Sequence, residues 1–476
     1  MRESLNKTLL KKFAIESRNE LIEKIALKAS VYGITKELSD KDRKTKGLEG
    51  FANNDDVVIT TNEGNRILSN AERSQRTALI EKIQRINKED RDGFNEVIEE
   101  VAYTWFNRFI ALRYMEVNGY LPSRIKILAS SDNTNTPEVL TEAMNVSLPI
   151  DKNLVYELKK DNKNEELYKY LLELQCSELN KPLPFMFEKI GHFAELLFPA
   201  GIITSKFFRT LVDTESITED AWSNVEIIGW LYQYYISEEK DRVIKAKKKY
   251  KKNEIPFATQ LFTPDWIVRY MVQNSLGRYW VESHEEDSDL KENWEFYLEN
   301  PEKEPDFDEK IAPYINKELS VEDIKCFDPA CGSGHILVYM FDVLHEIYSK
   351  CGYSRGEIPM LIIEKNLYGL DIDMRAYQLA CFAVIMKGMS YDKLLLRKIG
   401  REVDSRGKYI DLNIAYVKET NILFEDENTT LHDNIAFLAK EQSGEIYDRV
   451  KLFVESLKNA NIFGSLTKVE IGRAHV

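Results

Sequence analysis

The stretch "IKCFDPACGSGHILVYMFDVLHEIYSK", residues 324–350, decides the fold. A short apolar run, Ile324–Phe327, predicts a strand that ends at Asp328-Pro329. The glycine turn Gly332-Ser333-Gly334 follows, and apolar residues at helical spacing then predict a helix over about Ile336–Lys350. An acid and a glycine turn between a strand and a helix predict a ligand site, because the first amides of a helix have no partner within the helix.

The sequence on either side of this stretch alternates between strand and helix patterns. A second strand is predicted over Leu367–Ile372 and a third over about Leu412–Val417. Between them, Met374–Met389 has the pattern of a helix. Strands that alternate with helices predict a parallel α/β sheet.

The first part of the chain, residues 1–245, predicts a mainly α-helical region. "DGFNEVIEEVAYTWFNRFIALRYMEVNGYLP" (92–122) carries apolar residues every three or four positions, and a glycine and a proline close it. "ITEDAWSNVEIIGWLYQYYISEEKDRVIKAKKKY" (217–250) predicts a second helical stretch with Thr218 as its N-cap. Its many aromatic residues favour core packing over a platform for stacking bases.

Residues 246–320 predict a connecting region of mixed character. In "FATQLFTPDWIVRYMV" (257–272), Thr263-Pro264 predicts a turn, and a helix that starts with Asp265 follows. The proline suits this helix start because its φ is fixed and it has no N–H. The acidic stretch "ESHEEDSDLKENWEFYLENPEKEPDFDEK" (282–310) then predicts a spacer before the glycine turn.

Length and composition bound the class of protein. A chain of 476 residues predicts two or three domains, and 43% hydrophobic with 30% charged residues is typical of a soluble protein. No run of about 18 apolar residues and no signal-peptide core occur, so we expect no membrane contact. Five irregularly spaced cysteines favour the reducing cytoplasm.

The charge pattern leaves two interpretations of one segment open. A net charge of −14 argues mildly against nucleic-acid binding. Nevertheless, "DRVIKAKKKYKKNEIP" (241–256) is a dense basic block. It is either a solvated linker, which is the more common case, or a segment that contacts phosphates.

Several ligands can be tested against the glycine turn. A phosphate-binding P-loop needs a lysine where His335 stands, and a dinucleotide site needs a third glycine where Leu337 stands. Zinc needs four ligands, and only Cys326, Cys331 and His335 are near. Cys326 should alternate with its neighbours within the strand, so we expect buried thiols and no metal. A dinucleotide site and a purely structural turn remain less favoured alternatives.

S-adenosylmethionine fits the turn best. Asp328 can accept from its ammonium group, and Asp371 at the end of the second strand can accept from both ribose hydroxyls. Gly332 and Gly334 allow close approach because they have no Cβ, and the helix N-terminus favours a carboxylate. The residues therefore predict a site for this cofactor.

Two motif pairs resemble a known family. "FDPACGSGHILV" (327–338) with "LYGLDID" (367–373) resembles the gamma-type N6-adenine DNA methyltransferases. "EEVAYTWFNRFIALRYMEVNGYLPSR" (99–124) with "IPFATQLFTPDWIVRYMV" (255–272) resembles the PglX-type adenine methyltransferases of BREX phage-exclusion systems, over most of residues 1–469. The resemblance implies an incomplete α/β Rossmann-like S-adenosylmethionine-dependent methyltransferase domain over 321–469. It also implies double-stranded DNA as a partner and allows other BREX-system proteins as further partners.

The resemblance also implies a set of cofactor-binding residues. In the family, a Thr-Pro segment caps the methionine end of the cofactor, and a residue after the third strand contacts its adenine. That last residue is usually Asp, whereas "VKETNILF" (417–424) has Asn421 there, which can still accept from an exocyclic amine. The implied set is Phe262, Thr263, Pro264, Asp328, Pro329, Ala330, Cys331, Gly332, Gly334, Asp371, Ile372 and Asn421.

One family motif is missing from the sequence. These enzymes hold the flipped adenine with [DNS]-P-P-[YFW], and the chain has no Pro-Pro dipeptide, so we expect no catalytic residue within it. Residues 470–476, "EIGRAHV", match the translation of a sequencing adapter, which suggests an artefact at the end of a truncated reading frame. We therefore expect no methyl transfer by this chain alone. A non-catalytic DNA-binding or scaffold component of a defence complex, and a methyltransferase acting on RNA or protein, remain alternatives.

Overall fold

A computed structural model describes most of the chain. The described residues are 6–36, 58–61, 64–88, 91–123, 125–130, 136–187, 193–250, 254–260, 262–299, 304–399 and 412–417. They divide into two units: unit 1 comprises Met1–Glu238 with Ile385–Ile410, and unit 2 comprises Glu239–Val384 with Asp411–Val476. Asn421 and residues 470–476 lie outside the described residues. The functional boundaries proposed at 245/246 and 320/321 remain a prediction.

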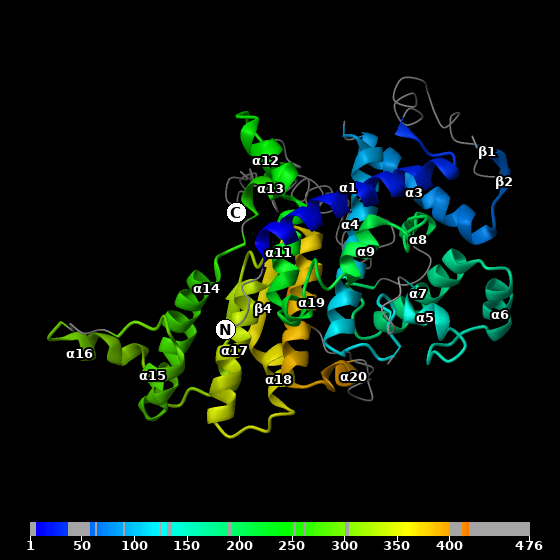
Figure 1. Cartoon of the computed structure of the whole chain (residues 1–476). Coiled ribbons are helices and arrows are strands. Elements are labelled where there is room, and N and C mark those ends of the chain that lie inside the picture. The colour runs from blue at the N-terminus through cyan, green and yellow to red at the C-terminus, as the bar shows by residue number, and fades with distance from the viewer. Residues whose placement is uncertain are drawn as a thin grey trace, which may run out of the picture. The chain divides into compact units, whose positions relative to one another are not determined.

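The described part of unit 1 is mainly helical, as predicted (Figure 1). Its described helices include α1 (Lys7–Val31), α3 (Asn70–Lys88), α4 (Gly93–Val117), α5 (Glu138–Thr141), α6 (Lys152–Lys160), α7 (Asn164–Asn180), α8 (Phe193–Leu196), α9 (Lys206–Val212), α10 (Glu219–Ser223), α11 (Glu226–Tyr235) and α20 (Leu395–Ile399). Strands β1 (Val58–Thr61) and β2 (Gly64–Ile67) form an antiparallel pair.

Helix α4 forms the centre of unit 1. The Asp92 side chain caps its first turn by accepting from the Asn95 amide at 3.1 Å, and Gly119 leaves the helix with a φ of +68°. Almost every side of α4 is buried, including Trp105, whose indole N–H donates to the Ala194 carbonyl at 2.9 Å. The apolar residues at helical spacing, on which the prediction rests, are therefore only some of the residues that α4 buries.

The predicted helical stretch 217–250 forms the short helices α10, α11 and α12 (Ser237–Lys245). Thr218 caps α10 as predicted, accepting from the Ala221 amide at 3.2 Å. Trp222 and Tyr235 are fully buried, which confirms core packing for these two aromatic residues. Trp230 is half-buried and stacks on Tyr234 with ring centroids 5.7 Å apart.

Unit 2 contains a parallel three-stranded sheet in the order β3-β4-β5. The strands are β3 (Cys326–Asp328), β4 (Leu367–Asp371) and β5 (Ile414–Tyr416). Helix α17 (His335–Lys350) connects the first two, together with the short α18 (Ile358–Leu361) and the π-helical turn η6 (Ile362–Asn366), and α19 (Met374–Tyr391) follows β4. The predicted alternation is confirmed, with strand ends that differ by one or two residues.

One face of this sheet packs against α17. Gly369 of β4 lies so close to α17 that a Cβ at this position would be 3.1 Å from Leu337. On the same face Cys326 and Ile414 are buried, whereas Phe327 on the opposite face is 55% exposed. The strand alternation predicted for Cys326 is therefore confirmed.

Most of the region between the basic block and the sheet is described. It comprises α13 (Ile255–Thr259), α14 (Asp265–Val272), the π-helical turn η2 (Gln273–Gly277), α15 (Arg278–Ser283), η3 (Glu285–Asn293), α16 (Phe307–Ile311), η4 (Ala312–Tyr314) and η5 (Val321–Asp323). Of these elements, α14, η2, η3 and η5 contact α17. Helix α14 starts at Asp265, as predicted, and Pro264 is its N-cap residue. The acidic stretch is anchored, because the Trp294 indole donates to Glu346 of α17 at 3.0 Å.

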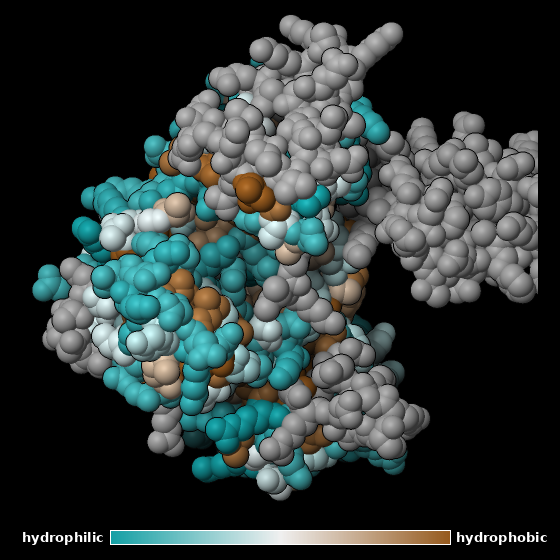
Figure 2. Space-filling model, turned by 90° about the vertical axis from the view of Figure 1, so that its right-hand side faces the viewer, coloured by the Kyte–Doolittle hydropathy of each residue, from teal (hydrophilic) through white to brown (hydrophobic). Residues whose placement is uncertain are grey.

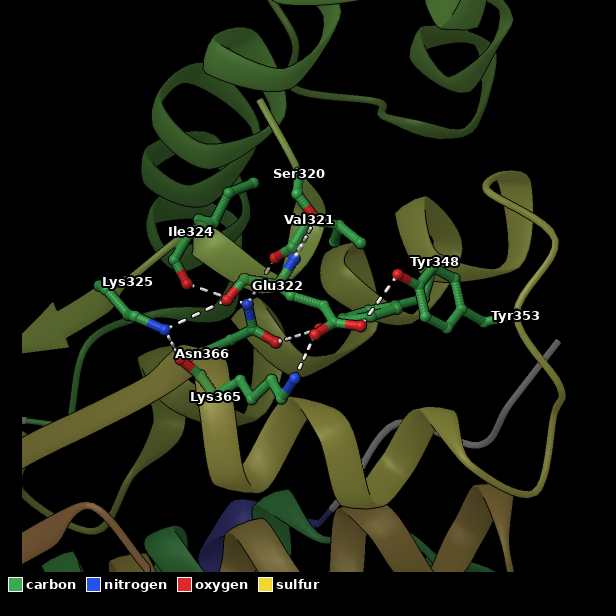
Figure 3. A network of polar contacts seen from close by, with 9 residues as sticks. All are labelled: Ser320, Val321, Glu322, Ile324, Lys325, Tyr348, Tyr353, Lys365 and Asn366. Carbon is green, nitrogen blue, oxygen red and sulfur yellow. Dashed lines mark hydrogen bonds and ion pairs between the residues drawn. The ribbon is translucent and has the colours of Figure 1, made fainter. Parts of the chain in front are cut away.

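The beginning of the sheet is held by a polar network around Asn366, which is completely buried (Figure 3). Its amide group donates to the carbonyls of Val321 at 2.7 Å and Ile324 at 2.9 Å. Its carbonyl accepts from the Tyr348 hydroxyl at 2.9 Å. Asn366 thus joins the approach to β3, the end of α17 and the start of β4.

On the face drawn in Figure 2, the described surface is mainly hydrophilic. Hydrophobic residues on this face form small separate patches among hydrophilic ones. Within the described part of the chain, no helix combines the length and the apolar character that a membrane span requires.

Candidate functional site

The two predicted acids end neighbouring strands and lie beside the glycine turn. Asp328 ends β3, and its Oδ1 accepts from the Ala330 amide at 3.1 Å. Asp371 ends β4, and its Oδ2 accepts from the Gly332 amide at 2.8 Å. The other oxygen of Asp371 accepts from the Asp373 amide at 2.7 Å. The carboxyl edge of the parallel sheet thus brings together residues that are distant in sequence.

The glycine turn is fixed by backbone hydrogen bonds. The Cys331 amide donates to the Leu370 carbonyl at 2.9 Å, and the Gly334 amide donates to the Cys331 carbonyl at 2.8 Å. Gly332 and Gly334 both have left-handed φ values, +55° and +85°. A Cβ at Gly332 would meet no atom within 4 Å, so the space beside it is open to a ligand.

The site is electrostatically suited to a cation. Burial raises the pKa of both Asp328 and Asp371. The Ala330 amide opposes this shift in the pKa of Asp328, and the Asp373 and Gly332 amides oppose it in the pKa of Asp371. Two partly desolvated carboxylates at one edge are stabilised by a positively charged ligand.

The cysteines near the site, Cys326 and Cys331, are free and buried, as predicted. Burial raises the pKa of Cys326 to about 12, and it raises the pKa of Cys331 as well. A raised pKa favours the thiol over the reactive thiolate.

The predicted Phe262-Thr263-Pro264 segment lies against the head of α17. The Phe262 ring stacks on the His335 imidazole, with centroids 4.3 Å apart and an interplanar angle of 5°. His335 Nδ1 lies 3.0 Å from the Thr263 carbonyl oxygen, so it donates to that carbonyl. Burial lowers the pKa of His335, which favours the neutral ring.

The remaining predicted residues differ in where they lie. Pro329 and Ala330 are exposed in the turn, and Ile372 is half-buried after β4. Asn421 stays a prediction, because it lies outside the described residues.

Three polar residues of the site were not among those predicted to bind the cofactor: Gln260, His335 and Asp373. Gln260 Nε2 donates to Asp373 Oδ2 at 2.6 Å, and Asp373 also accepts from the Arg375 guanidinium at 2.8 Å. The second acid of "LDID" was a signal for Asp373. The sequence holds no comparable signal for Gln260.

Comparison with known proteins shows which proteins this chain is similar to. Residues 307–413 match the family model described as "MmeI, DNA-methyltransferase domain". The chain is 39% identical over 423 residues to the adenine-specific methyltransferase BrxX of Escherichia coli O9:H4 (strain HS), covering 88% of this chain and 33% of the relative. It is 40% identical over 406 residues to the adenine-specific methyltransferase PglX of Lacticaseibacillus casei (strain Zhang), covering 80% and 32%.

A more distant relative is a putative type II restriction enzyme and methyltransferase of Methanocaldococcus jannaschii. It is 26% identical over 224 residues, which is 44% of this chain and 17% of the relative. The chain thus spans about a third of the length of the BrxX and PglX relatives. Over most of its own length it is homologous to adenine-specific methyltransferases of the PglX and BrxX type, which confirms the predicted resemblance.

Proposed function

We propose that this chain forms the cofactor-binding part of a site-specific DNA adenine-N6 methyltransferase that uses S-adenosylmethionine and marks host DNA in a BREX-type phage defence system. The observation that carries the proposal is the meeting of Asp328, Asp371 and the glycine turn at one sheet edge, in a chain homologous to adenine-specific methyltransferases. The parallel order β3-β4-β5 with its connecting helices supports a Rossmann-like domain.

The residues have distinct roles in this proposal. Asp328 accepts from the ammonium group of the cofactor, and Asp371 accepts from its ribose hydroxyls with the acceptor capacity that the Gly332 and Asp373 amides leave available. The open space beside Gly332 admits the methionine part, and Phe262, Thr263 and Pro264 form a wall of the site. When bound, the cofactor supplies a methyl group on a sulfonium. Asn421 would contact the adenine of the cofactor.

The acceptor of the methyl group is proposed to be adenine in double-stranded DNA. Direct displacement needs the adenine amine held in line with the sulfonium, and misplacement by about 1 Å can cost about a hundredfold in rate. We propose that the groups that hold the base are not among these 476 residues, because their sequence has no Pro-Pro dipeptide. The proposed role also implies a cytoplasmic location and other BREX-system proteins as partners.

Asp371→Ala tests the proposed cofactor site. Hydrogen bonds to a charged group contribute about 1.5–3 kcal/mol, so S-adenosylmethionine should bind about tenfold more weakly or worse. Isothermal titration calorimetry on the 476-residue chain measures the affinity. Glu309→Ala, which removes an exposed acid of unit 2, is the matched control and should bind like the parent chain. Equal affinity of parent and Asp371→Ala would refute the role of Asp371.

A further inference from the structure

The segment Phe257–Pro264 is attached to the sheet edge at two separate points. At the first point, Gln260 Nε2 donates to Asp373 Oδ2 at 2.6 Å, across 113 positions of sequence. At the second point, the Thr263 carbonyl accepts from His335 at 3.0 Å, and Phe262 stacks on the same ring. One attachment lies in the loop after β4 and the other at the head of α17 after β3.

The first attachment is rigid because Asp373 is itself fixed. Its carboxylate is 8% exposed and accepts from the Arg375 amide at 2.9 Å and from the Arg375 guanidinium at 3.0 and 2.8 Å. The Arg375 guanidinium also lies over the Phe257 ring, 5.2 Å from its centroid. Charge-assisted hydrogen bonds of this kind are about twice as strong as those between neutral groups.

The same hydrogen-bond network includes Asp371, the acid that is proposed to bind the ribose of the cofactor. The Asp373 amide donates to Asp371, and Asp371 in turn accepts from the Gly332 amide. Gln260 therefore lies one hydrogen-bonded residue away from Asp371. Gln260 has a further contact through its main chain, because the Lys240 ammonium of α12 donates to the main-chain carbonyl of Gln260.

We infer that Gln260, Asp373 and His335 are positioning residues that hold the Phe257–Pro264 segment against both loops of the sheet edge before the cofactor binds. We call the contacts that these three residues make with the segment the clasp. The inference rests on the proposed function, since the segment is a wall of the proposed cofactor site. A wall fixed in advance spares the cofactor the entropic cost of ordering it. The clasp thus contributes to cofactor affinity without touching the cofactor.

Hydrogen exchange and calorimetry on the 476-residue chain test the clasp. In Gln260→Ala, peptides covering residues 257–264 should exchange about tenfold faster without any cofactor, because a hydrogen bond to a charged group is lost. Peptides from β3 and β4 should exchange as in the parent, and S-adenosylmethionine should bind several-fold more weakly. Unchanged exchange over residues 257–264 would overturn the inference.

A reversed pair makes the test specific. Gln260→Glu places two carboxylates together and should loosen the segment and weaken binding, whereas adding Asp373→Asn restores a donor and an acceptor. The double variant should exchange more slowly over residues 257–264 than Gln260→Glu, and independent, additive effects would contradict a direct contact.

A matched control separates the effect of losing the clasp from the effect of a general loss of stability. Gln273 is buried, whereas Gln260 is half-buried, and Gln273 donates to the Tyr339 hydroxyl at 2.6 Å outside the clasp. Gln273→Ala should lower stability but leave exchange over residues 257–264 like the parent. If the parent chain itself does not bind S-adenosylmethionine, the proposed function fails, while the exchange of the free chain still decides whether the clasp exists.

Discussion

Gly332 and Gly334 are required for different reasons, although both have left-handed backbone conformations. Gly332 borders open space, so its glycine is needed for the turn and for the approach of a ligand. A Cβ at Gly334 would lie 3.0 Å from the Cα of Ala380 in α19, so this glycine also allows the turn before α17 to pack closely against α19. The sequence motif does not distinguish these two roles.

Alanine substitutions should separate the two glycines. Both variants place a Cβ in the left-handed region, which costs about 1–2 kcal/mol. Gly334→Ala adds a clash with backbone that cannot rotate away, so its loss of unfolding free energy should be clearly larger than that of Gly332→Ala. Urea denaturation measures the difference. Equal losses would show that the turn before α17 moves away from α19 without cost.

The carboxyls of Asp328 and Asp371 predict a pH dependence of cofactor binding. Burial raises their pKa, so they become protonated at a higher pH than ordinary aspartates. Affinity for the cationic cofactor should therefore fall as the pH is lowered through this raised pKa. Stability without cofactor should change in the opposite sense, because the folded state binds these protons more tightly than the unfolded state and gains stability as the pH falls.

Calorimetry and urea denaturation over a series of pH values check both trends. Asp371→Asn serves as the control, since it removes the contribution of one carboxyl to each trend. The assignment fails if parent and variant have parallel pH profiles.

At the scale of elements, the network around Asn366 holds the beginnings of β3 and β4 in register. Lys325 Nζ donates to the Lys365 carbonyl at 2.6 Å and to the Glu322 carbonyl at 3.1 Å. The Tyr353 hydroxyl donates to Glu322 at 3.0 Å, and Lys365 forms an ion pair with the same carboxylate. The buried amide of Asn366 lies at the centre, and the charged groups surround it near the surface (Figure 3).

Asn366→Ala should destabilise unit 2 strongly. The change leaves the carbonyls of Val321 and Ile324 and the Tyr348 hydroxyl without their partner. Each unsatisfied buried group costs about 1–3 kcal/mol, so the loss in unfolding free energy should be about 3 kcal/mol or more. Urea denaturation measures it. Lys365→Met removes only a partly exposed ion pair and should cost less than about 1 kcal/mol. A comparable loss in both variants would contradict the central role of Asn366.

At the scale of the whole molecule, charge is unevenly distributed. The chain has a net charge of −14, yet the basic block carries exposed cations on and after α12. Arg242 is paired with Glu239 at 2.8 Å and Lys245 with Asp241 at 3.3 Å. No acid among the described residues forms an ion pair with Lys247, Lys248 or Lys249, and all three are exposed. Among the described residues of the block, these three lysines are the best suited to phosphates.

Replacing Lys247, Lys248 and Lys249 by alanine should flatten the salt dependence of the DNA binding that the proposed function implies. Each lost contact with a duplex phosphate reduces the slope of log affinity against log salt by about 0.9. Fluorescence anisotropy with a labelled duplex at several salt concentrations measures the slope. The control removes the same charge from lysines paired with glutamates on unit 1, at Lys160, Lys163 and Lys181. An unchanged slope would leave the block a solvated linker.

The sequence by itself determined the local features of this protein. The periodic apolar residues of α4, the Thr218 cap, the glycine turn and the alternation of strands and helices follow from neighbouring residues, and each is found near its predicted position. Local conformation can be predicted in this way because backbone preferences and periodic burial act over a few residues. The alternation also indicated that Asp328 and Asp371 end strands of one sheet.

Only the tertiary structure decided which distant groups meet. Gln260 and Asp373 are 113 positions apart, and His335 and Thr263 are 72 apart, so no periodicity relates them. The packing of Gly334 against Ala380 likewise depends on how α19 lies against the turn before α17. Such contacts form because a parallel sheet gathers the loops after successive strands at one edge, where a buried polar group is stable only beside a matching partner.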